Sequence, residues 1–152
     1  MGYEGWSLKS VSSAAVDTNV FIYAFMRHKV HGKKSLRLLE SFEAGACKGF
    51  TTTVTICELA VKPMMSREEK LAREYKNKLL ALPGLTVLDI TPDLALEAAR
   101  IRAKYPISLP DALQISAATT QKAQAFVTND RSICRLKAVD GTRVMALGSM
   151  RP

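Results

Sequence analysis

The stretch AVDTNVFIYAF, residues 15–25, decides the fold class of this chain. Together with Ala14, its first residues form a short apolar run that stops at Asp17. From Val20 to Phe25 the apolar positions then follow helical spacing. The stretch therefore predicts a short buried strand that passes directly into a largely buried helix, as in the first half of a strand–helix–strand unit.

The same alternation of strand and helix patterns continues along the rest of the chain. Parallel neighbours need crossover connections, and these are nearly always right-handed helices, so the alternation predicts an α/β fold with a parallel sheet covered on both faces. Pro63 is expected to end the helix that carries Ile56 and Leu59. The further strands are predicted at 49–53, 85–88, 125–128 and 143–146, and the further helices at 35–43, 56–60, 67–82, 91–105 and from 108 onward.

Length and composition indicate one domain. At 152 residues and 47% hydrophobic content, the chain suits a single compact core. Residues 1–13 are rich in Gly and Ser and are expected to form a flexible or loosely docked extension before a domain at 14–152. Three scattered cysteines make a poor disulfide framework, and no apolar run suits a signal peptide or a membrane span. We therefore expect a cytoplasmic protein with no membrane partner.

The charge balance favours a polyanionic partner. The chain has 22 Lys and Arg residues against 14 Asp and Glu residues, a formal net charge of +8. Nucleic acid is one explanation, and solubility alone is about equally good. A zinc site is not supported, because the only histidines, His28 and His31, lie far in sequence from any cysteine.

Four acidic residues fall where a parallel sheet would bring them together. Asp17 ends the first strand, Glu58 lies in the helix after the second strand, Asp111 opens a late helix and Asp130 follows a late strand. In such sheets ligands bind beyond the carboxyl ends of the strands. Crowded carboxylates raise one another's pKa unless a cation neutralises them, and oxygen-only ligands select Mg²⁺ or Mn²⁺. A metal held in this way suits phosphoryl transfer.

Each acid also has a simpler explanation. Asp17 and Asp111 precede helices, where Asp often serves only as a cap. Glu58 could be a solvated residue of a helix start, and Asp130 an ordinary turn residue. A phosphatase-like enzyme with Asp17 as nucleophile is a further alternative, but Asn19 stands where a second aspartate would be expected.

Four segments of the chain form a recognisable set: AVDTNVFIYAF, TTTVTICELA, LPDALQISAA and VTNDRSICRL. They closely resemble the signature segments of PIN-domain nucleases, with the VapC-type toxins as the nearest group. They occur in that family's order and approximate spacing between about Ala14 and Leu147, so their combination is specific. The resemblance implies a three-layer α/β/α sandwich with a mainly parallel central sheet, and metal-dependent hydrolysis of single-stranded or loop RNA, often by a homodimer.

The resemblance also assigns roles to individual residues. Asp17, Asp111 and Asp130 would hold the catalytic Mg²⁺ or Mn²⁺ ion, and Glu58 would complete the acidic pocket and hold or activate water. Asn19 and Thr128 would support the first acid by hydrogen bonds, although local turn bonds explain both equally well. The chain departs from many relatives in having Ser132 and Cys134 where another acid often follows, so one ion or two stays open.

Basic residues near the acids are candidates for binding RNA phosphates. Those between the first two predicted helices, and one beside the fourth acid, are the favoured set. A solvated helix face explains the basic residues of 70–78, and the aromatic residues Phe21, Tyr23 and Phe25 are interpreted as core. The favoured set is Arg27, Lys29, Lys33, Lys34 and Arg131.

Two functions therefore compete. The first is an active ribonuclease, which the resemblance extends to a toxin restrained by an antitoxin protein that inserts a helix and a basic side chain into the acidic pocket. The second is an RNA-binding or scaffold module of the same fold without significant turnover.

Overall fold

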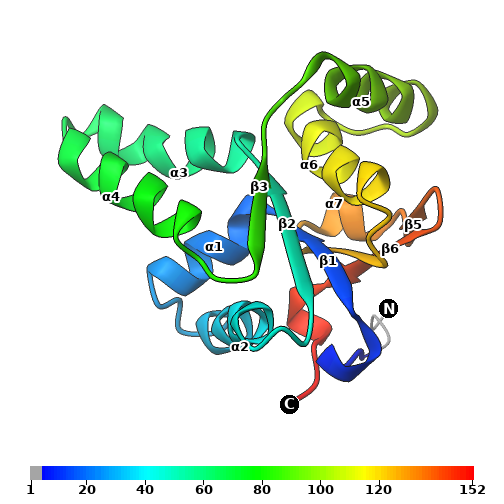
Figure 1. Cartoon of the computed structure of the whole chain (residues 1–152), viewed down its shortest axis with the longest axis horizontal. Coiled ribbons are helices and arrows are strands. Elements are labelled where there is room, and N and C mark those ends of the chain that lie inside the picture. Colours follow the sequence, from blue (N-terminus) through cyan, green and yellow to red (C-terminus); the bar gives the residue numbers. More distant parts are fainter. Residues whose placement is uncertain (1–4) are drawn as a thin grey trace.

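A six-stranded, mainly parallel sheet forms the centre of the computed structural model, which describes residues 5–152 (Figure 1). The strand order is β3-β2-β1-β4-β6-β5, and only the β5–β6 pair is antiparallel. This arrangement confirms the α/β fold class and the parallel sheet expected from the sequence. The strands are β1 (Ser13–Val16), β2 (Lys48–Thr52), β3 (Leu85–Leu88), β4 (Ala125–Thr128), β5 (Ala138–Val139) and β6 (Thr142–Ala146).

Helices cover both faces of the sheet and complete the three layers (Figure 1). Helices α1 to α4 lie on one side, and α5, α6 and α7 lie on the other. Within residues 5–152, no helix has the length and apolar character needed to cross a membrane. The helices are α1 (Thr18–Phe25), α2 (Gly32–Glu43), α3 (Val54–Met65), α4 (Glu69–Leu80), α5 (Pro92–Lys104), α6 (Leu109–Thr120) and α7 (Arg131–Cys134), with short 3-10 turns η1 (Leu8–Ser10) and η2 (Leu147–Ser149).

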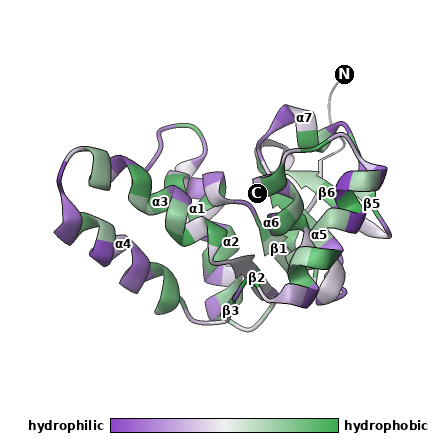
Figure 2. Cartoon of the chain, turned by 90° about the horizontal axis from the view of Figure 1, so that it is seen from above, coloured by the Kyte–Doolittle hydropathy of each residue, from purple (hydrophilic) through white to green (hydrophobic). Residues whose placement is uncertain are grey.

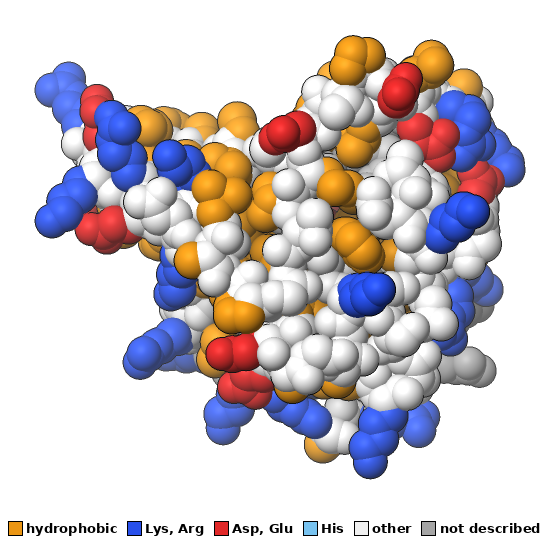
Figure 3. Space-filling view, in the orientation of Figure 1, with side chains coloured by type: hydrophobic (Ala, Val, Ile, Leu, Met, Phe, Trp, Pro, Cys, Tyr) orange, Lys and Arg blue, Asp and Glu red, His pale blue; other side chains and the backbone are white. Residues whose placement is uncertain are grey.

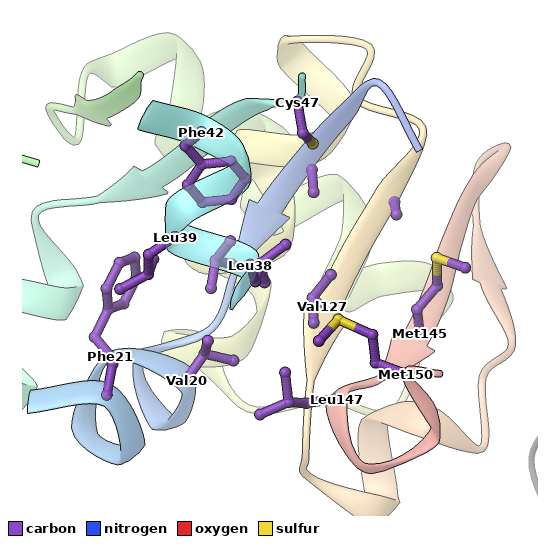
Figure 4. Close-up of a cluster of buried hydrophobic side chains, with 14 of the residues drawn as sticks. Val20, Phe21, Leu38, Leu39, Phe42, Cys47, Val127, Met145, Leu147 and Met150 are labelled. Atoms are coloured by element: carbon purple, nitrogen blue, oxygen red, sulfur yellow. The ribbon is translucent and has the colours of Figure 1, made fainter. Parts of the chain in front are cut away.

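The two cores follow from the alternation of side chains along the strands. Ala14 and Val16 of β1 face the core under α1 and α2, whereas Ala15 faces the core under α5 and α6. Figure 4 shows side chains of α1 and α2 directed toward Val127 of β4 in the first core. Continuous apolar runs such as β1 and β4 are therefore needed, because both faces of these strands are buried.

Helix α3 differs from the sequence prediction at Pro63. The proline was expected to end the helix, but α3 continues to Met65 with Pro63 inside its last turn. A proline so close to the end removes a single backbone hydrogen bond, and its ring is buried. Helices α3 and α4 then project from the body as an arm with a hydrophilic outer side (Figure 2).

The described part of the N-terminal segment packs on the domain. The Trp6 side chain is 7% exposed, and its indole N–H donates to the carbonyl oxygen of Ala146 at 2.8 Å. Val11 is also buried in the first core. The sequence predicts a flexible or loosely docked extension over 1–13; residues 1–4 of it lie outside the described residues, and residues 5–13 are docked by these contacts.

Candidate active site

The carboxyl ends of the central strands carry the acids predicted from the sequence. Asp17 directly follows β1, and Asp130 lies two residues after β4. These two strands are parallel neighbours with Val16 opposite Val127, so the two acids leave the same edge of the sheet. Glu58 lies in α3, which follows β2, and Asp111 lies in the first turn of α6. All four acids therefore belong to elements that begin at this edge.

Asp17 is the buried member of the group, with 8% of its surface exposed. Its Oδ1 accepts a hydrogen bond from the backbone N–H of Thr18 at 2.8 Å, which caps helix α1. Its Oδ2 accepts from the Thr128 hydroxyl at 2.6 Å and from the Asn19 amide at 3.3 Å. Asn19 and Thr128 thus both hydrogen-bond to the Asp17 carboxylate.

The pKa of Asp17 is raised to about 6. Burial is the main cause, and the hydrogen bonds from Thr128 and Thr18 oppose it. The negative charges of Asp111 and Glu58 raise this pKa further. Burial and Asp111 also raise the pKa of Glu58. Three of the acids are therefore close enough to disfavour one another's charge, which is the situation that a bound cation relieves.

A buried amide joins the elements that carry three of these acids. The side-chain NH₂ of Gln114, in α6, donates to the hydroxyls of Thr18 at 2.9 Å and Thr55 at 2.7 Å. Its Oε1 accepts from the Thr52 hydroxyl at 2.9 Å, and the Thr18 hydroxyl donates to Glu58 at 3.2 Å. Sequence reasoning missed this group. The available signal was one amide within the apolar run of α6 and the threonine run at 51–55.

Asp111 and Asp130 hydrogen-bond to nearby serines. Asp111 accepts from the Ser108 hydroxyl at 2.6 Å. Asp130 caps α7 and accepts from both the backbone N–H and the hydroxyl of Ser132, at 2.7 and 2.6 Å. These bonds lower the pKa of the exposed Asp130 carboxyl. The backbone N–H of Asp130 also donates to the Thr128 hydroxyl at 3.0 Å, so Thr128 contacts both acids.

The donor chemistry of the site fits a hard divalent cation, although the side chains do not form a finished cage. In residues 5–152, no three Asp, Glu, His or Cys side chains are grouped closely enough to hold a metal. The acids are oxygen donors, and the pKa of Asp17 is raised mainly by burial and further by the charges of Asp111 and Glu58. Asp17, Asp111 and Asp130 are the side chains that could hold such an ion.

The predicted basic residues are spread over the α1–α2 loop, the first turn of α2 and the start of α7. Arg27 and Lys29 are exposed in the loop between α1 and α2, and Lys33 is exposed in the first turn of α2. Lys34 donates from its ammonium group to the carbonyl oxygen of Gly148. Arg131 is exposed at the start of α7. A second group of cations, Lys70, Arg73, Lys76 and Lys78, is exposed along α4, where Figure 3 shows Lys and Arg side chains around the projecting arm.

An apolar pocket adjoins Glu58 between α1 and the α3–α4 arm. It has a volume of about 190 Å³. Apolar side chains of three helices line this pocket together with Glu58. Its lining includes Ile22, Phe25, Met26, Glu58, Leu71 and Tyr75.

Comparison with known proteins agrees with this architecture. A model of the PIN domain family matches residues 14–139. No curated protein matches the sequence.

Several solved structures are similar to this chain in fold. VapBC2 from Rickettsia felis bound to a DNA fragment from their promoter has a TM-score of 0.67 at 17% identity, covering 88% of this chain and 98% of that chain. A toxin–antitoxin complex from Klebsiella pneumoniae has a TM-score of 0.62 at 21% identity, covering 90% and 98%. The Mycobacterium tuberculosis toxin VapC20, described as cleaving the sarcin–ricin loop, has a TM-score of 0.65 at 17% identity, covering 87% and 99%. At such low identity the similarity establishes the fold alone.

Proposed function

This chain belongs to the PIN domain family, and on that premise we propose that it is a metal-dependent endoribonuclease that hydrolyses RNA phosphodiester bonds. The observation that carries the proposal is the buried Asp17, whose pKa is raised to about 6 by burial and by the neighbouring charges of Asp111 and Glu58. A protein has little reason to bury a carboxylate beside two others unless a cation joins them.

Each acid has a proposed role in holding or using the ion. Asp17, Asp111 and Asp130 hold Mg²⁺ or Mn²⁺, with one ion or two. When bound, the ion lowers the pKa of a coordinated water and offsets charge on the phosphate. Glu58 orients the attacking water and receives its proton, and burial and Asp111 raise its pKa, which makes it a better base. Asn19 and Thr128 keep the Asp17 carboxylate in one orientation.

The substrate proposed is RNA. The net charge of +8 favours a polyanion. The exposed cations beside the acids can contact phosphates on either side of the bond that is cut. VapC20, which shares the fold, is described as cleaving the sarcin–ricin loop, so a structured RNA loop belongs in the substrate panel. The proposed phosphate contacts are Arg27, Lys29, Lys33, Lys34 and Arg131.

A toxin restrained by an antitoxin is the biological setting that we propose. The pocket between α1 and the α3–α4 arm would receive an apolar helix, and Glu58 at its side would pair with a basic side chain of that helix. VapBC2 and the Klebsiella pneumoniae protein, which share the fold, are toxin–antitoxin assemblies. The three free cysteines suit a reducing cytoplasm.

We also propose that the chain forms a homodimer. Large apolar side chains remain on its surface, among them Met65 at 80% exposure and Leu96 at 72%. Such residues are available to a second copy. Sedimentation velocity on the purified chain should show a dimer, and a monomer at all concentrations would contradict this part of the proposal.

Cleavage of an RNA panel with and without Mn²⁺ or Mg²⁺ tests the proposal. We expect cleavage that requires the ion, stops in EDTA and is lost by more than about 100-fold in Asp17→Asn, beyond the loss expected for an outer-shell residue. Asp93→Asn, at an exposed position in the first turn of α5, is the matched control and should cleave normally. A protein that binds RNA equally with either residue at 17 and never cuts it would be a scaffold instead.

A further inference from the structure

The loop between α1 and α2 carries the only two histidines of the chain, and they stack on each other. The ring centroids of His28 and His31 are 5.3 Å apart at an interplanar angle of 14°. The Tyr23 ring, from α1, lies 4.8 Å from the first and 5.0 Å from the second. Three rings from a loop and two helix ends therefore form one cluster, the Tyr23–His28–His31 ledge.

Hydrogen bonds fix the orientation of both imidazoles. The Nδ1 atom of His28 accepts from the backbone N–H groups of Val30 and His31, each at 3.2 Å. The Nε2 atom of His31 lies 3.2 Å from the Asn129 amide nitrogen, which can only donate, so this Nε2 accepts. Each ring then carries its N–H on the other nitrogen. Both rings are thereby held in a fixed orientation, and burial lowers the pKa of His31.

The ledge is connected to the buried acid through two asparagines. The side-chain oxygen of Asn19 accepts from the backbone N–H of Asn129 at 3.3 Å, and its amide donates to Asp17 at 3.3 Å. Asn129 also immediately precedes Asp130. Asn129 and Asn19 are thus the only residues in the hydrogen-bonded path from His31 to Asp17. The rings and the acids are then close enough for neighbouring nucleotides of one RNA strand to contact both groups.

The surroundings of the ledge suit a nucleotide. From Thr18 to Leu39 the sequence contains no Asp or Glu. His28 is exposed, and so are Arg27 and Lys29 on either side of it. An unpaired base stacks on aromatic or imidazole rings, and the phosphates on either side of it pair with cations. The ledge and its neighbours provide both kinds of group.

We propose that the Tyr23–His28–His31 ledge is a base-stacking subsite that holds an unpaired nucleotide adjacent to the cleaved phosphate. This inference rests on the proposed ribonuclease function and adds the substrate feature that it selects, a single-stranded or flipped base. His28 supplies the exposed ring face, and Tyr23 and His31 support that ring from the protein side. The cations beside it bind phosphates without reading the base.

NMR on the two histidines tests the subsite directly, because the chain gives only two imidazole Cε1–H signals. Asp111→Asn is a suitable background, since it should prevent cleavage and Asp111 makes no contact with the ledge residues. Addition of a single-stranded RNA hexamer should shift both signals. An unchanged pair of signals while the RNA binds elsewhere would overturn the subsite and leave the ribonuclease proposal standing.

Variants distinguish the contribution of the His28 ring to RNA binding from that of the turn that holds it. His28→Asn keeps an acceptor for the backbone of the turn but lacks a ring, and should weaken hexamer binding about tenfold, the value of one stacked base. His28→Phe restores a ring and should recover most of that loss. Val30→Ala, at a residue 70% exposed in the same loop, is the control and should bind normally.

Other results have distinct meanings. If His28→Asn, made in the Asp111→Asn background, bound the hexamer as tightly as that background does, the proposed subsite would be wrong and the ribonuclease proposal would stand. A parent that binds no RNA, together with an unmodified chain that cuts none, would overturn the ribonuclease proposal with it. An oligoglutamate peptide that shifts the two signals as strongly as RNA would overturn base stacking and indicate an acidic protein partner.

Discussion

Asp17 and Asp130 begin from the same local structure and differ in pKa. Both follow parallel neighbouring strands and both cap a helix with one carboxylate oxygen. The Asp17 carboxyl is buried and its pKa is raised to about 6, whereas the exposed Asp130 carboxyl has a lowered pKa because Ser132 donates to it. Helix capping therefore does not account for the difference between the two pKa values. The burial of Asp17 does.

Thr128 connects the two environments. Its hydroxyl donates to Asp17 and accepts from the backbone N–H of Asp130. One side chain thus fixes the buried acid relative to the exposed one. If burial is the decisive difference between the two acids, substitutions should have effects of different size on stability and cleavage. The residues to compare are Asp17, Thr128 and Ser132.

The largest expected effect is a gain of stability in Asp17→Asn. An acid whose folded pKa is raised from 3.8 to about 6 costs nothing below pH 3.8, destabilises the fold progressively between pH 3.8 and 6, and carries its full cost above that range. At about 1.4 kcal/mol for each pKa unit, the cost above pH 7 approaches about 3 kcal/mol. Urea unfolding in EDTA should therefore show a variant that is more stable at pH 8 and equal to the unsubstituted chain near pH 4.

Asp130→Asn is the matched comparison for that experiment. Its lowered pKa has the opposite sign, so the substitution should bring no gain at pH 8, and Asn is about as good a helix cap as Asp. Equal gains in the two variants would mean that burial does not separate the two acids.

The next effect is stabilisation by a divalent ion. An ion at 100 times its dissociation constant should stabilise the folded chain by about 2.7 kcal/mol. The rise in Tm should be larger at pH 8 than at pH 5, because protons compete for Asp17 below its pKa of about 6. Thermal unfolding with Mn²⁺ measures it. A rise in Asp17→Asn as large as in the unsubstituted chain would show that the ion binds elsewhere.

The sequence was sufficient for the features that depend on periodicity. Apolar runs ending in Asp17 and near Asp130 placed both acids at the correct edge, because strand direction follows from the alternation with helices. The short α7 and the two-residue β5 were missed, since elements of that length have no measurable period.

Features that depend on tertiary contacts were not predictable from the sequence. Gln114 has an ordinary place on a helix, and only the packing of α6 near β2, α1 and α3 brings it to four threonine hydroxyls. The docking of Trp6 requires Ala146, 140 positions away in sequence. The different burial of Asp17 and Asp130 could not be predicted from the sequence either. In the sequence, both residues follow a strand and precede a helix, so nothing local separates them. The catalytic roles of the four acids stay predictions.

Thr128→Val should have a smaller effect that is shared between stability and activity. The substitution removes the 2.6 Å bond to the Asp17 carboxylate, so the pKa of Asp17 should rise further above 6. We expect the free energy of unfolding to fall by about 2 kcal/mol at pH 8 and the rate of cleavage to fall by about 10-fold to 100-fold. The lower limb of the pH–rate profile should move to higher pH.

Thr142→Val controls for the loss of a buried threonine hydroxyl. Thr142, the first residue of β6, donates at 3.1 Å to the carbonyl oxygen of Ala123, two residues before β4. This bond lies at the amino ends of the two parallel strands, opposite the edge that carries the acids. It should lose about 1 kcal/mol of stability with an unchanged pH–rate profile. A shift of the profile in Thr142→Val would show that Thr128 acts through general stability and not through Asp17.

Ser132→Ala should have the smallest effect. It removes the hydroxyl bond at 2.6 Å but keeps the backbone N–H bond, so the pKa of Asp130 should move only part of the way back toward 3.8. A lowered pKa contributes stability that is present above pH 4 and lost on acidification, and exposure to water limits the change at pH 7 to less than about 1 kcal/mol. The carboxyl ¹³C titration of Asp130 and urea unfolding measure both quantities. If Ser132→Ala cost as much stability as Thr128→Val, a hydrogen bond would be worth the same at either acid, and burial could not be what sets Asp17 apart.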